Sequence, residues 1–278
     1  MSTASLPASG TRSIPVPKDP GHTRRLVGGT IAAGALVVLH ALAFEGTQFR
    51  PQLLVEGWAG MAGFLAEAVP PDTDWQRVLK PSLQATMVTL WIGLLGTTLS
   101  VPFALLLAVL GARNTTPNSV VYQASRAILS FFRAVPDIVF ALIFVTAVGL
   151  GPFAGVLALI CHNTGVMGKL WAEAMEEVDP GPQQALRTAG ANGIQQVANA
   201  TLPLVLAQWT GLLLYRFDVN VRSSLVLGLV GAGGIGLLIN RSIKNFQFDE
   251  MLTHILVVLV LIIVVDQVSA FIRKRLAV

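Results

Sequence analysis

Apolar and polar stretches alternate along the chain with a spacing typical of membrane helices. The apolar stretches lie at about residues 26–44, 82–110, 136–148, 153–171, 202–215 and 251–272. A bilayer-spanning helix needs about 20 predominantly apolar residues. The third stretch is short for a span, so its helix is expected to begin earlier. The pattern predicts an all-α integral membrane protein with about six transmembrane helices.

Composition supports this fold class. The 278 residues are 53% hydrophobic and 12% charged, whereas soluble domains have about 25% charged residues. A soluble protein could not cover so much apolar surface. The single cysteine, Cys161, excludes an intrachain disulfide and a cysteine metal cluster. The net charge of +4 is too small to indicate nucleic-acid binding, so the expected non-protein partner is membrane lipid.

Basic residues mark both ends of the chain. Residues 1–25 are rich in Ser, Thr, Pro and Gly, which predicts a disordered basic tail. A signal peptide is disfavoured because the next apolar run is too long for a signal core. Arg273-Lys274-Arg275 closes the chain. Of 19 Lys and Arg, twelve fall in segments expected inside and seven in 45–80 and 216–250, so both termini are expected to be cytoplasmic.

Three regions follow from this pattern: the tail at 1–25, a first span with an external segment at 26–80, and a transmembrane domain at 81–275. The external segment has an apolar middle, Leu53–Val69, which predicts a short interfacial helix. Pro102 is expected to kink the second span. Residues 119–135 predict a helix at the inner interface, and Gly149–Pro152 a tight turn.

The longest polar interruption of the transmembrane domain is Glu173–Pro203. Asp179-Pro180-Gly181-Pro182 is a helix-start signal. Gly190 and Gly193 break the helical pattern that follows, so two short helices with a bend at 190–193 are expected. Composition alone equally allows a solvated connector. The acidic residues at its start predict either a basic partner surface or a solvated face: Glu173, Glu176, Glu177 and Asp179.

The spacing within this segment resembles the EAA loop of ABC importer permeases. The sequence has Gln for Glu, Leu for the second Ala and Ala200 for Ile, but the Gly and Leu-Pro positions are intact. In that family the loop inserts into a groove on the ATPase subunit. The resemblance therefore implies a cytoplasmic ATPase-coupling loop whose key positions are Gln184, Ala185, Leu186, Gly190, Leu202 and Pro203.

Residues 162–191 and 217–236 resemble the phosphonate importer permeases of the methionine-importer-like superfamily, and the likeness covers about 80–275. It implies transport of phosphonate- or phosphate-type oxyanions across a bacterial inner membrane. The implied partners are ABC ATPase subunits, a second copy of the chain and an extracytoplasmic binding protein. The chain has no P-loop sequence, so ATP and Mg are expected on the partner ATPase and no cofactor on this chain. A methionine-type permease and an ion-coupled transporter remain alternatives.

A glycine-rich sequence follows the fifth apolar stretch. It satisfies G-x-G-x-x-G, with Asp249 or Glu250 as a possible ribose ligand of a dinucleotide enzyme. That site needs a strand and a parallel sheet, which nothing else in the chain predicts. We therefore expect a tight turn or broken helix near the pore, formed by Gly231, Gly233, Gly234 and Gly236.

Charged residues close the fifth apolar stretch. Arg216, Asp218 and Arg222 follow Tyr215, where the span is expected to end. One interpretation is an Arg–Asp pair that fixes the helix end. The other is a translocation path in which these residues, with Ser223 and Ser224, lower the barrier for an anion. No base lies near the two serines and the four histidines have no ligand spacing, so no catalytic residue or metal site is expected.

Overall fold

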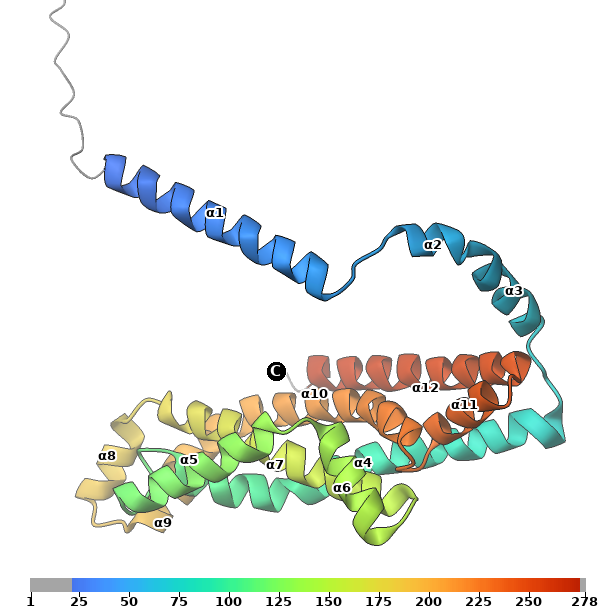
Figure 1. Cartoon of the computed structure of the whole chain (residues 1–278). Helices are drawn as coiled ribbons and strands as arrows, with labels where there is room; N and C mark the ends of the chain where they lie inside the picture. The colour runs from blue at the N-terminus through green and yellow to red at the C-terminus, as the bar shows by residue number, and fades with distance from the viewer. Residues whose placement is uncertain (1–21, 276–278) are drawn as a thin grey trace, which may run out of the picture. The chain divides into compact units, whose positions relative to one another are not determined.

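The computed structural model describes residues 22–275, with side chains from residue 25 onward. The basic tail predicted at 1–25 therefore lies almost wholly outside the described residues. All regular structure in residues 22–275 is helical (Figure 1). The chain divides into two compact units, one up to Met61 and one from Ala62 onward. The predicted all-α membrane protein is confirmed.

The first unit holds the first predicted span. Helix α1 covers His22–Gly46, and its side chains from Arg25 onward are exposed. Its apolar composition and length suit a membrane crossing. The interfacial helix expected at Leu53–Val69 is divided into α2, Gln52–Glu56, and α3, Trp58–Ala68. Gly57 separates them.

The helical bundle of the second unit begins with a long helix. A π-helical turn, η1 (Trp75–Leu79), leads directly into α4 (Lys80–Gly111). Residues 75–80, which the sequence assigned to the end of the external segment, therefore belong to this 37-residue helix. Pro102 lies inside α4, and helix continues on both sides of it.

The third predicted span is a broken helix. Helices α5 (Ser119–Ala134) and α6 (Asp137–Val148) meet at an 87° bend. Twelve residues extend about 18 Å, so α6 alone is too short to cross a bilayer. Residues 22–275 thus contain five spanning candidates, or six if α5 and α6 form one broken span or a re-entrant loop.

The C-terminal half differs most from the sequence pattern. Helix α7 covers Pro152–Glu176, and α10 covers Leu202–Leu229. The fifth span therefore does not end near Tyr215, and the expectation of an external segment at 216–250 is wrong for residues 216–229. Residues 216–229 are helical, followed by α11 (Ile235–Lys244) and α12 (Phe248–Arg275).

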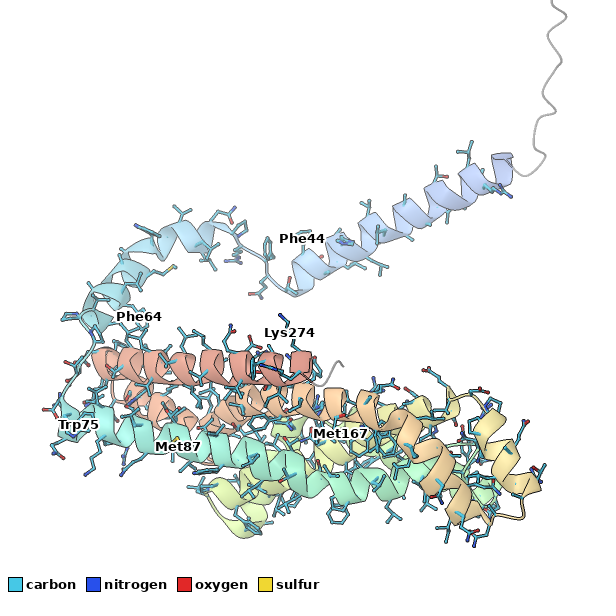
Figure 2. All side chains as sticks on the ribbon, turned by 180° about the vertical axis from the view of Figure 1, so that it is seen from behind. Phe44, Phe64, Trp75, Met87, Met167 and Lys274 are labelled. Carbon is cyan, nitrogen blue, oxygen red and sulfur yellow. The ribbon has the colours of Figure 1, made fainter. Side chains whose placement is uncertain are left out.

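The bundle core lies where α4 packs on α7 and α10. A Cβ at Gly93 would stand 2.8 Å from Val221 Cγ2, and one at Gly96 would stand 2.5 Å from Leu159 Cβ. Glycine at these positions allows the close backbone approach that is common between membrane helices. Met167 of α7 is fully buried in this region, whereas Met87 of α4 projects outward (Figure 2).

We predict that Gly96→Val destabilises the protein, because the added side chain overlaps Leu159. Overpacking of this kind costs about 1–3 kcal/mol. Thermal unfolding in detergent measures the loss. Gly34→Val is the control, since nothing lies within 4 Å of a Cβ at Gly34. Equal effects of the two changes would contradict the prediction.

Candidate functional site

The 173–203 segment forms the two short helices that its sequence predicts. Helix α8 covers Gly181–Thr188, with Pro182 in its first turn, and α9 covers Gly193–Gln196. The second helix is not separate from the next span. It continues through a π-helical turn, η2 (Val197–Thr201), into α10, so Leu202-Pro203 lies within one helix from Gly193 to Leu229.

The bend between α8 and α9 is fixed by backbone geometry. Gly190 has φ +86°, a left-handed conformation that favours glycine. Its amide donates to the Arg187 carbonyl at 3.1 Å, and the Ala191 amide donates to the Leu186 carbonyl at 3.0 Å. These two bonds form a Schellman cap. Asn192 and Gln195 then form a reciprocal capping box that starts α9.

The key positions of this segment differ in exposure. Gln184, Ala185 and Gly190 are exposed on and after α8, and Pro203 is exposed at the start of α10. Leu186 and Leu202 are half-buried. Figure 1 shows α8 and α9 at one end of the bundle, with α11 at the other. The exposed residues are therefore accessible for contact at that end.

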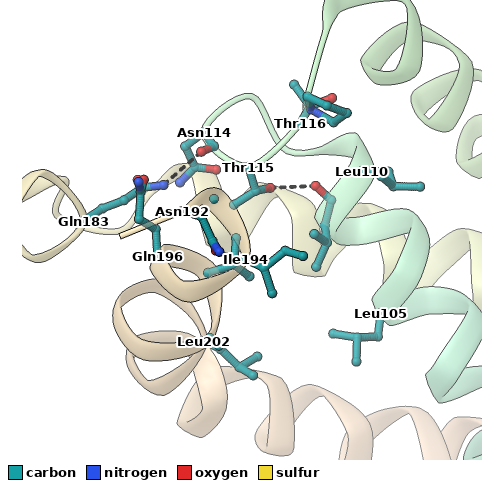
Figure 3. A pocket seen from close by; sticks show the side chains of 15 residues that line it. Leu105, Leu110, Asn114, Thr115, Thr116, Gln183, Asn192, Ile194, Gln196 and Leu202 are labelled. Atoms are coloured by element: carbon teal, nitrogen blue, oxygen red, sulfur yellow. Dashed lines mark hydrogen bonds between the residues drawn. The ribbon is translucent and has the colours of Figure 1, made fainter. Parts of the chain in front are cut away.

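Hydrogen bonds tie the segment to the α4–α5 turn. Gln183 Nε2 donates to the Asn114 carbonyl at 2.9 Å (Figure 3). Asn114 Nδ2 donates to the Met175 carbonyl at 2.5 Å. A groove of about 830 Å³ lies beside these contacts. Its walls come from the end of α4 and from α9 through the start of α10, including Leu105, Ile194 and Leu202.

Three of the acidic residues before α8 have partners within the chain. Arg126 of α5 lies 2.9 Å from Glu176 and 3.5 Å from Glu173. Asp179 accepts the Gly181 amide at 2.9 Å. Arg126 thus anchors Glu173 and Glu176, whereas Asp179 caps only its own turn and stays exposed. The expectation of a solvated or partner-facing acidic surface therefore stays a prediction.

Arg216 lies in the interior of the bundle. It retains 9% exposure and donates to Asn163 Oδ1 of α7 through Nε at 3.2 Å and Nη2 at 2.6 Å. Nη2 also lies 3.4 Å from Asn220 Oδ1, and Asn220 Nδ2 donates to Thr97 Oγ1 of α4 at 2.6 Å. The roles of Asn163, Asn220 and Thr97 were not predicted from the sequence. Their polar side chains within apolar stretches were the sequence feature that could have indicated a buried polar contact.

The Arg–Asp pair exists, but between Asp218 and Arg222 and not at a helix end. The two residues lie one turn apart on α10, and Arg222 Nη2 is 2.8 Å from Asp218 Oδ2. Asp266 of α12, which the sequence analysis did not single out, lies 3.7 Å from Arg222. The side chains of Arg222 and Asp266 are 49% and 48% exposed. Ser224 is buried and donates to the Thr89 carbonyl of α4 at 3.0 Å, whereas Ser223 is half-buried.

The glycine-rich sequence forms a turn between α10 and α11 as predicted, but Gly236 lies inside α11 and not in the turn. Gly231, Gly233 and Gly234 have φ values of +92°, +83° and +75°. The Gly151 amide donates to the Gly231 carbonyl at 3.0 Å, which joins this turn to the start of α7. Thr89 Oγ1 accepts the Ile235 amide at 2.9 Å. A dinucleotide site is ruled out here, because residues 22–275 contain no strand to precede it.

The chain before α4 is fixed to the start of α12. The Asp72 amide donates to the Asp249 carbonyl at 3.3 Å, and Thr253 Oγ1 donates to the Asp72 carbonyl at 2.7 Å. The Asp74 amide and the Arg77 guanidinium hydrogen-bond the Asp72 carboxylate and lower its pKa below the usual range. This charged contact lies at the end of the bundle opposite to α8.

We predict that Gly190→Ala loosens the bend, because alanine is strained at φ +86°. The cost of a left-handed non-glycine residue is about 1–2 kcal/mol. Hydrogen exchange of the amides from Leu186 to Ala191 should accelerate about tenfold. Gly193→Ala is the matched control, because Gly193 lies in helix α9 and no atom lies within 4 Å of a Cβ added there. Unchanged exchange in Gly190→Ala would contradict the prediction.

Similar proteins were found by sequence. The chain is 38% identical over 248 residues to the phosphite transport system permease protein PtxC of Stutzerimonas stutzeri, covering 89% of this chain and 88% of that protein. It is also 38% identical over 228 residues to the phosphate-import permease protein PhnE of Mycolicibacterium smegmatis. That match covers 82% of this chain but only 42% of the relative's length.

The fold is also found among solved structures. An inward-facing structure of the MetNI methionine ABC transporter matches with a TM-score of 0.58 and 22% identity, covering 72% of this chain and 95% of the matched one. The family model for the binding-protein-dependent transport system inner membrane component matches residues 100–278. These residues include α5 to α12, the C-terminal part of α4 and the whole 173–203 segment. The chain therefore belongs to the family of binding-protein-dependent transport system inner membrane components.

Proposed function

We propose that this chain is the permease subunit of an ATP-driven ABC importer for phosphonate-, phosphite- or phosphate-type oxyanions. The observation that carries the proposal is the exposed face of α8 ahead of the Gly190 bend, with the spacing of an ATPase-coupling loop. The substrate class is supported by 38% identity to a phosphite permease along nearly the whole chain. The methionine transporter shares the fold at lower identity and is the second candidate.

A partner ATPase would bind and hydrolyse ATP with Mg. Its surface would receive Gln184, Ala185 and Leu186, and ATP-driven closure would pull on the 173–203 segment. Because α7 runs into this segment and α10 continues out of it without a break, the pull would reach both helices directly. In this proposal the 173–203 segment and both chain termini would lie in the cytoplasm of a bacterium, on the inner side of its inner membrane.

A second copy of the chain would complete the transport path, and an extracytoplasmic binding protein would deliver the substrate. The half-exposed ion cluster of Arg222 and Asp266 supports this assembly. An arginine facing lipid near the middle of a bilayer costs about 2.5–3.5 kcal/mol even on insertion scales. Protein or water therefore covers this face of α10 and α12.

We place the translocation path along the face of α10 that carries Asp218, Arg222 and Ser223, close to the glycine turn at 231–236. Arg216 and Ser224 support this face from inside the bundle, where both are buried. Arg222 is the exposed cation of this face. Because Asp218 and Asp266 offset its charge, Arg222 would lower the barrier for an anion by exchanging a carboxylate partner for that anion.

The coupling role predicts that Ala185→Trp and Gly190→Trp leave the protein in the membrane but abolish ATPase capture and oxyanion uptake. The bulky side chain would block the exposed surface of α8 or its bend. The experiment purifies the complex with its ATPase and measures uptake in proteoliposomes with ATP. Gly60→Trp on α3 is the control, since nothing lies within 4 Å of a Cβ there. Normal uptake in both loop variants would refute the docking role.

The path role predicts that Arg222→Met lowers the initial rate of oxyanion uptake about tenfold, which corresponds to about 1.4 kcal/mol in the barrier. ATPase capture should remain, because Arg222 lies far along α10 from the 173–203 segment. Uptake of phosphite and phosphate into proteoliposomes provides the measurement. Retention of the full rate in an assembled complex would remove Arg222 from the path.

A further inference from the structure

A chain of hydrogen bonds centred on Arg216 joins three helices inside the bundle. Its guanidinium binds Asn163 of α7 through two donors, and Asn220 relays the contact to Thr97 of α4. Thr97 in turn donates to the Gly93 carbonyl at 2.7 Å. Arg216 itself stands on α10. We name these four residues, Thr97, Asn163, Arg216 and Asn220, the polar clamp.

Burial of the polar clamp has a high free-energy cost. Among the described residues, no carboxylate lies within ion-pair distance of Arg216, and its side-chain hydrogen bonds go to neutral amide oxygens. Asn163 is fully buried and its Nδ2 has no hydrogen-bond partner in residues 22–275, a loss of about 1–3 kcal/mol. Apolar residues of similar volume often stabilise such a site as well or better. Stability alone therefore does not explain the polar clamp.

Its position points to a mechanical role. Helix α7 enters the 173–203 segment and α10 leaves it, so a pull on this segment acts on both. Arg216 is about 21 Å along α10 from Leu202 at a rise of 1.5 Å per residue. At the same level, Gly93 and Gly96 bring α4 into close contact with Val221 and Leu159. The clamp and the close contacts thus fasten α4, α7 and α10 at one point beyond the loop.

We propose that Arg216 is a positioning residue for transport, which ties α7, α10 and α4 so that movement of the loop displaces all three helices as one body. This inference rests on the proposed coupling to an ATPase. Without the guanidinium, α7 and α10 would slide past one another, and ATP hydrolysis would continue without moving substrate. Direct contact of Arg216 with the transported anion is the rival role that the experiment separates.

The first measurement is the amount of substrate moved per ATP hydrolysed by the full complex in proteoliposomes. Arg216→Met keeps the volume but removes all donors, and should lower this ratio about tenfold while the ATPase rate is retained. Arg216→Lys keeps the charge but not the forked geometry of the guanidinium. Its ratio of substrate moved to ATP hydrolysed should therefore lie between those of Arg216→Met and the wild type. Arg241→Met on α11 is the control for loss of an arginine, because that side chain is exposed.

Thr97→Val removes only the hydrogen bond between the clamp and α4. This variant replaces Arg216→Met in the experiment if Arg216→Met fails to assemble. It should lower the ratio about two- to threefold. A normal ratio in assembled Arg216→Lys and Thr97→Val would overturn the proposal.

The second measurement asks whether a covalent tether replaces the clamp. Glu177 and Gln208 line one small hollow between the end of α7 and α10. In a Cys161→Ser background, Glu177→Cys and Gln208→Cys are joined by a short thiol-reactive crosslinker. The tether should restore the ratio in Arg216→Met at least fivefold. If Arg216 binds the anion directly, the tether should not restore the ratio, and Arg216→Met should raise the KM for substrate. That result would overturn the proposal.

Failure of the proposed substrate class is recognised separately. If the wild-type complex moves another solute, the same ratio is measured with that solute. Hydrogen exchange of α7 and α10 needs neither substrate nor ATPase. Arg216→Met should accelerate exchange near Asn163 and Asn220, and the tether should reverse the change. Unchanged exchange in Arg216→Met would refute the clamp whatever the protein transports.

Discussion

The close approach of α4 to α7 and α10 is the contact on which the rest of the structure depends. Gly93 and Gly96 leave no room for a Cβ, and the side chains of Val221 and Leu159 occupy that space. In a bilayer the hydrophobic effect does not drive helices together, so such packing and buried hydrogen bonds must do so. The polar clamp, the Ser224 contact to α4 and the turn at 231–236 all form at or beyond this seam.

The loop at the end of the bundle is built from local rules. A Schellman cap ends α8, a capping box starts α9, and Arg126 anchors the carboxylates before them. These bonds leave the outer face of α8 free, while the helices on both sides run directly into the bundle. A docking surface is thereby connected to the membrane part through rigid helices and not through a flexible connector.

Charges within the spans show how packing changes the meaning of a residue. Arg216 and Arg222 lie six positions apart on one helix, yet one is buried among amides and the other is half-exposed between two carboxylates. Their neighbours come from α7 and α12, which are distant in sequence. Local patterning placed both arginines at the end of a span, because charged residues usually mark a helix end in an apolar sequence.

The sequence by itself determined the fold class, the two short loop helices, the Gly190 bend and the glycine turn. These follow from composition and from local backbone preferences, which depend on neighbouring residues only. Tertiary structure decided that α10 continues to Leu229, that α5 and α6 form one bent pair, and that Arg216 pairs with Asn163 and not with Asp218. Hydropathy treats a buried ionic or amide group as a break, because a hydropathy value does not include the hydrogen-bond partners that offset its burial.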